Sequence, residues 1–153
     1  MSSSLGGEEE ARRLVLAYQQ YQAQADAIVQ QISLTQVTAD GLNRALGAVE
    51  AMEKAEEGQE MLVPIGSGSF VHARLASRER VVLNVGAGVS IEKTVADAKE
   101  ALNTRKADVA EASKKLNEVL SKIDQEMQKI QAILGEYESQ MQQQQGPGSG
   151  QVV

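Results

Sequence analysis

The sequence predicts an α+β fold in which two long helices form an antiparallel coiled coil and two consecutive β-hairpins join them. Three observations support this prediction: apolar residues recur in steps of four and three throughout the long stretches on either side of the centre, short β-branched runs separated by glycine fill residues 58–92, and aromatic residues make up only 3% of the 153 residues. Small aliphatic side chains fill a narrow seam between helices better than a thick globular core. We expect residues 1–7 and the Gln-, Gly- and Pro-rich residues 143–153 to be disordered.

The first predicted helix covers residues 8–57, which contain no proline. One row of seam residues recurs every seven positions and a second row follows four positions behind it, as in a coiled coil. The rows are Leu14, Tyr21, Ile28, Thr35, Leu42 and Val49, and Tyr18, Ala25, Ile32, Ala39, Leu46 and Glu53. Asp40-Gly41 could form a turn, but the repeat passes through it unbroken, so we expect one helix with a weak point there.

The second predicted helix covers residues 93–142 and repeats the pattern. Its first row is Val95, Leu102, Val109, Leu116, Ile123, Ile130 and Tyr137, and its companion row is Ala98, Arg105, Ala112, Val119, Glu126 and Ile133. A flanking apolar row widens the stripe toward the C-terminus: Leu120, Met127, Leu134 and Met141. The similar helix lengths favour an antiparallel pair with both chain ends at one tip. A continuous parallel dimer is the alternative, and it would leave the hairpins as an interruption.

Four short strands are predicted between the helices, at about 61–65, 69–76, 80–85 and 88–92. The sequences GSG and GAG provide the positive φ angles that tight hairpins need. An isolated hairpin is marginally stable and exposes unpaired edges, and nothing else in this chain is expected to cover these two. We therefore expect strands of several subunits to complete a shared sheet or barrel through Val63, Ile65, Val71, Ala73, Leu75, Val81, Leu83 and Val85.

Several classes of function are disfavoured by the composition. The chain has no cysteine and a single histidine, His72, so we expect no metal site. Its formal charge is −6 and its basic residues form no stripe, so we expect no nucleic-acid partner. Neither glycine pair has the order of a phosphate-binding loop, and no acid–base pair is evident, so we expect no cofactor and no enzymatic activity. No apolar run suits a membrane span and the first residues do not resemble a signal peptide, so we expect a cytoplasmic protein without a membrane partner.

The hairpin sequences carry a family resemblance. "LVPIGSGSFVHARL" followed by "VVLNVGAGVSIEKT", between two long helices, resembles the alpha class of prefoldin subunits, most of all those of archaea. The resemblance implies a hexamer of two alpha and four beta subunits, with a double β-barrel body and six coiled-coil arms. Such assemblies hold unfolded proteins without ATP and pass them to a group II chaperonin. The Gly/Pro-rich tail departs from the family pattern.

The ends of the predicted coiled coil carry more apolar residues than its seam can bury. Val15, Leu16, Leu134 and Met141 lie outside the two main rows, and surplus apolar surface indicates a binding site. We expect unfolded clients to bind Leu14, Val15, Leu16, Tyr18, Ile133, Leu134, Tyr137 and Met141. The adjacent acidic residues 8–10 favour basic client segments. The alternative is a structural coiled-coil module whose hairpins only tether it to a scaffold.

Overall fold

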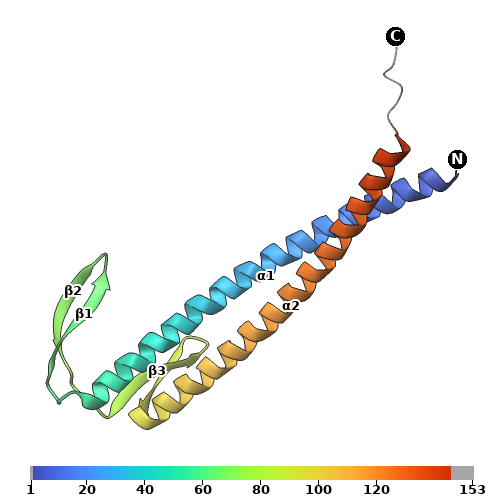
Figure 1. The fold of residues 1–153 in the computed structure, drawn as a ribbon. Helices are drawn as coiled ribbons and strands as arrows, with labels where there is room; N and C mark the ends of the chain where they lie inside the picture. Colours follow the sequence, from blue (N-terminus) through green and yellow to red (C-terminus); the bar gives the residue numbers. More distant parts are fainter. Residues whose placement is uncertain (1, 146–153) are drawn as a thin grey trace. The chain divides into compact units, whose positions relative to one another are not determined.

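The computed structural model describes residues 2–145, so most of the predicted tail at 143–153 lies outside the described residues. The elements follow the order α1 (Ser2–Lys54), β1 (Glu60–Gly66), β2 (Ser69–Arg74), β3 (Arg80–Gly86), β4 (Val89–Thr94) and α2 (Val95–Gln144) (Figure 1). Two long helices with two consecutive hairpins between them are thus confirmed.

The chain divides into two compact units. The terminal unit contains the described residues up to 34 and from 113, and the hairpin unit contains residues 35–112. In the terminal unit, Gln131 Nε2 donates a hydrogen bond to Tyr18 Oη at 2.9 Å, while Gly7 lies against Tyr137. Earlier positions of α1 therefore meet later positions of α2, as an antiparallel pair requires.

Helix α1 begins at Ser2, six residues before the predicted start, so residues 2–7 are helical rather than disordered. The reason is continued packing, because Gly7 and Ala11 extend the 4–3 steps on the N-terminal side of Leu14 and all three are half-buried. The helix continues through Gly41 without a break and ends at Lys54.

Hydrogen bonds order the chain after α1 and at the start of α2. After α1, Gly58 has a φ of 83° and donates its N–H to the carbonyl of Leu75 at 2.8 Å, which turns the chain into the hairpins. Thr94 Oγ1 accepts the N–H of Asp97 at 3.2 Å, so Thr94 caps α2 and the helix begins at Val95 rather than residue 93.

The seam of α2 changes its companion row within the terminal unit. Val119 and Ile133 are 43% and 47% exposed, whereas Leu120 and Leu134 are half-buried. The predicted companion row is therefore wrong in this part of α2. The first row of α2 can be combined at 4–3 spacing with either of two companion rows, one through Val119 and Ile133 and the other through Leu120 and Leu134. The more apolar of these two rows is the one that packs in the seam.

The two hairpins have the same local design. β1 pairs antiparallel with β2 through Val63 and Val71, and β3 pairs antiparallel with β4 through Leu83 and Ile91. Each forms a separate two-stranded sheet, and each ladder is irregular just before its turn. The starts of β2 and β3 agree with the prediction, and the other strand boundaries differ from it by one or two residues.

Candidate functional site

The β1–β2 hairpin exposes apolar side chains on both faces. In register, Val63 lies opposite Val71 on one face, and Leu62 lies opposite His72 on the other. The exposed fractions are 38% for Val63, 58% for Leu62 and 58% for Phe70, and every residue of β1 is exposed. A hairpin with two uncovered apolar faces and two unpaired edges is typical of a strand pair that another chain completes.

The β3–β4 hairpin is instead packed against the helices of its own chain. Leu83 is 7% exposed and forms one core cluster with Leu46 and Val49 of α1 and Val95 and Leu102 of α2. The expectation that nothing in the chain covers the hairpins is therefore wrong for this one. Leu83 serves the chain's own core and does not present its side chain for pairing between subunits.

The remaining residues predicted for oligomerisation divide by exposure. Val63, Ile65, Val71 and Val85 are exposed, and Ala73, Leu75 and Val81 are half-buried. Val82, which the prediction omitted, is 66% exposed because it points to the face opposite Leu83.

Three polar contacts, which the sequence did not predict as a group, connect α2 to β3, α2 to α1, and the linker between the hairpins to α1. The Arg105 guanidinium on α2 donates to the carbonyl of Asn84 near the second turn. Lys99 Nζ lies 2.9 Å from Glu53 Oε2, and Arg78 Nη2 donates to the carbonyl of Glu53 at 2.9 Å. The signal for the first contact was present, because Arg105 is a charged residue in a seam row. In the structure that position reaches a strand.

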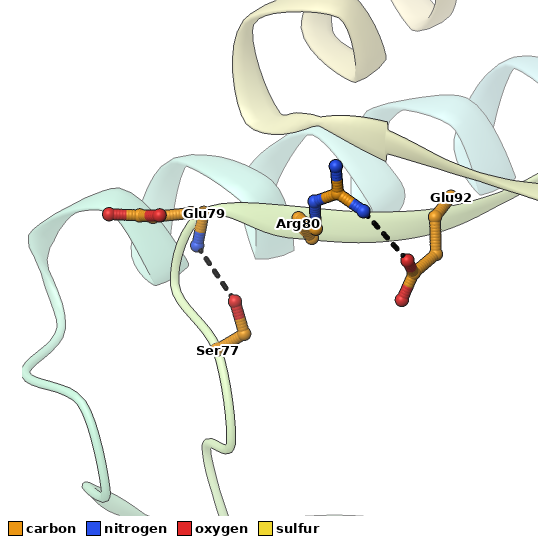
Figure 2. Close-up of polar contacts among 4 residues, drawn as sticks. All are labelled: Ser77, Glu79, Arg80 and Glu92. Atoms are coloured by element: carbon orange, nitrogen blue, oxygen red, sulfur yellow. Dashed lines mark hydrogen bonds and ion pairs between the residues drawn. The ribbon is translucent and has the colours of Figure 1, made fainter.

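The linker between the hairpins is held where it enters β3. The N–H of Glu79 donates to Ser77 Oγ at 3.2 Å, and Arg80 pairs with Glu92 across β3 and β4 at 3.0 Å (Figure 2). The N–H of Val95 donates to the carbonyl of Glu79 at 3.0 Å, so the linker also meets the start of α2.

An apolar groove of about 570 Å³ lies in the hairpin unit, between the last turns of α1 and the strands. Small side chains open it on the α1 side, because Ala48, Ala51 and Ala55 line it together with Met52. Leu75 and Val82 line the strand side. The groove therefore borders residues of both hairpins.

The predicted client-binding residues fall into two groups in the terminal unit. Four are exposed: Val15 at 43%, Leu16 at 60%, Ile133 at 47% and Met141 at 39%. The other four are half-buried in the seam: Leu14, Tyr18, Leu134 and Tyr137. Ile133 and Leu134 have exchanged the places that the sequence predicted for them, Leu134 in the seam and Ile133 outside it.

Within the described residues, neither long helix has a stretch apolar enough to cross a membrane. No group of three or more His, Asp or Glu side chains in residues 2–145 is arranged to hold a metal ion.

Two long helices that pair through a narrow seam and are joined by two hairpins define a coiled-coil protein with a β-hairpin insert. Residues 21–143 match the family model described as "Prefoldin subunit". A prefoldin subunit alpha of Methanothrix thermoacetophila is 56% identical over 102 residues, which cover 67% of each chain. That of Methanosarcina mazei is 38% identical over 101 residues, covering 64% of this chain and 71% of the relative. The chain therefore belongs to the prefoldin family and is similar to its archaeal alpha subunits, which confirms the resemblance.

A solved structure shows the same fold. Filamentous PFD from Methanocaldococcus jannaschii aligns with a TM-score of 0.66 at 22% identity, covering 76% of this chain and 96% of that one. The family's role is that of a chaperone subunit.

Proposed function

We propose that the chain is one arm of an ATP-independent chaperone that captures unfolded proteins at its coiled-coil tips and transfers them to a group II chaperonin in the cytoplasm. The observation that carries this proposal is the exposed apolar group formed by Val15, Leu16, Ile133 and Met141 in the terminal unit. A two-helix seam does not need these residues, and exposing them in water is unfavourable unless a partner covers them.

The exposed hairpin supports a proposal for the partner subunits. We propose that beta-class subunits complete β1–β2, in a complex of two alpha and four beta chains. Main-chain pairing along β1 and burial of Val63, Ile65 and Val71 would supply the contacts, and Val85 and Val82 would add a second contact surface. The role of Leu83 in such a complex is indirect, through the core that positions β3–β4.

The mechanism follows from several weak contacts acting together. Each tip offers a few aliphatic side chains, which suffice only for weak and unspecific binding. Several tips that engage one unfolded chain raise its residence time by about 10²–10⁴-fold without any new kind of contact. Release then requires no nucleotide, because the tips dissociate from the client one at a time.

The test replaces Val15, Leu16, Ile133 and Met141 with Ser in the assembled complex. We expect the variant to lose most of its suppression of client aggregation in the absence of ATP, because the contact surface is removed while the seam stays intact. The control makes the same change to Ser at Val29, Val37 and Val119. These residues are exposed to a similar degree, at 48%, 65% and 43%, but lie farther from the ends of the chain. Undiminished suppression by the tip variant would refute client capture and favour the tethering module.

A further inference from the structure

The terminal unit contains a small groove between the first turns of α1 and the last turns of α2. Its volume is about 160 Å³, and its walls include Leu14, Leu134 and Tyr137. The groove exists because α1 has small residues, Gly7 and Ala11, at two successive seam positions. Gly7 also lets the Tyr137 ring approach, since a Cβ there would lie 3.2 Å from Tyr137 Cε2.

The size and lining of the groove suit one bulky apolar side chain. An apolar cavity of about 150 Å³ accommodates a benzene ring, so a groove of this volume has room for an aromatic or branched aliphatic group. Ile133 also lines it, and this side chain is 47% exposed. The groove is thus continuous with the exposed tip residues to which clients are proposed to bind.

The charged residues of the groove are all acidic. Glu10 and Glu136 line it, both are exposed, and neither forms an ion pair within the described part of the chain. Arg12 and Arg13 lie on the same turns of α1 but do not line the groove. A groove whose walls combine apolar side chains with two unpaired carboxylates is complementary to an apolar side chain that has a cationic neighbour.

We propose that this groove gives the tip a sequence preference: it holds one bulky apolar side chain of an unfolded client, and Glu10 and Glu136 favour clients in which Lys or Arg adjoins that side chain. The inference deepens the proposed client binding and depends on it. It assigns a specificity role to two exposed carboxylates that the seam does not use.

The test compares three unstructured fluorescent peptides with the same aromatic and aliphatic centre, flanked by Lys/Arg, by Ser or by Glu. Binding to the assembled complex is measured by fluorescence anisotropy at low and high salt. We expect the basic peptide to bind about fivefold more tightly than the Ser-flanked one at low salt, as two exposed charge pairs allow, and the difference to shrink at high salt.

Two variants and one control locate the effect. The double variant E10Q/E136Q should remove the preference for the basic peptide while leaving the Ser-flanked peptide unchanged. Ala11→Leu, which fills the groove, should weaken all three peptides. The control E111Q/E118Q removes two exposed α2 carboxylates that do not line the groove and should retain the preference.

The outcomes separate this inference from the proposed function. If the peptides bind but E10Q/E136Q keeps the preference, or E111Q/E118Q loses it equally, the groove is not the selective element and the inference is wrong. If a second copy of the tip fills the groove, the mass of the complex rises with concentration and Ala11→Leu reverses the rise, which also overturns it. If no peptide and no unfolded client binds, the proposed function itself fails.

Discussion

The two hairpins of this chain have nearly the same turn and very different surroundings. The three turn residues have φ angles of 106°, 49° and 71° at 66–68, and of 109°, 52° and 75° at 86–88. Strand lengths are also the same, with seven residues before each turn and six after it. Yet β1–β2 contains no buried residue, whereas β3 places Leu83 in the core. Local sequence therefore determines the shape of a hairpin, and contacts elsewhere determine whether it docks.

The second hairpin packs on both helices through the Leu83 core, and α2 adds contacts at each end of it. β4 ends at Thr94 and α2 begins at the next residue, so no linker separates them. The Arg105 guanidinium then holds the carbonyl of Asn84 at the far end of the same hairpin. The first hairpin is held at its base by two backbone hydrogen bonds, in which the N–H of Leu75 donates to the carbonyl of Gln59 at 3.0 Å and the N–H of Gly58 donates to the carbonyl of Leu75 at 2.8 Å. One hairpin is thus docked on the helices of its own chain, and the other forms a separate two-stranded sheet without a buried residue.

Core substitutions should give the largest difference in stability loss between the hairpins, and Leu83→Ala is the main one. We expect a loss of about 2–3 kcal/mol in the free energy of unfolding of the full chain, because a buried leucine leaves a void beside Val49 and Leu102. Val71→Ala in the exposed hairpin should cost less than about 0.5 kcal/mol in the same urea titration. The control Val82→Ala lies on the same strand as Leu83 but faces outward. Equal losses at 71 and 83 would show that both hairpins belong to one cooperative core.

Substitutions of the turn glycines should have a smaller effect on stability, and the two glycines are closely matched in conformation. Gly66→Ala and Gly86→Ala should each cost about 1–2 kcal/mol locally, because alanine disfavours such positive φ angles. An added Cβ would meet no atom within 4 Å at either position, so backbone strain is the whole effect. We expect Gly86→Ala to lower global stability, and Gly66→Ala to act mainly as faster amide hydrogen exchange within β1–β2.

Gly41→Ala is the control for the glycine pair. This glycine is helical and also has open space around its Cβ position, so the change should stabilise the chain by up to about 1 kcal/mol. A global loss for Gly66→Ala as large as that for Gly86→Ala would contradict the separation of the two hairpins.

The sequence was sufficient for features that depend on local patterns. The 4–3 repeat and the turn glycines predicted both helices and both hairpins, because periodicity and positive φ act within a few residues. The same repeat leaves Val15 and Leu16 outside the seam, and both residues are exposed in the structure.

Features that depend on competing packing choices were not predictable in this way. Leu120 and Leu134 joined the seam of α2 in place of Val119 and Ile133, because either set of positions satisfies the repeat and only the facing helix decides between them. The burial of Leu83 likewise depends on α1 and α2 residues that are distant in sequence. The client-facing and oligomeric roles of the tip and hairpin residues stay predictions.

The cross-strand ion pairs should give the smallest difference between the hairpins. Arg80 and Glu92 lie 3.0 Å apart with side chains 62% and 58% exposed (Figure 2), and Arg74 and Glu60 lie 3.7 Å apart at 75% and 70%. Exposed pairs of this kind contribute about 0–1 kcal/mol, and salt screens them. A double-mutant cycle on Arg80 and Glu92 should therefore give a coupling below about 0.5 kcal/mol, and the cycle on Arg74 and Glu60 a value near zero. A coupling above about 1 kcal/mol for the first pair alone would mean that the docked hairpin holds its charge pair more rigidly than the exposed hairpin does.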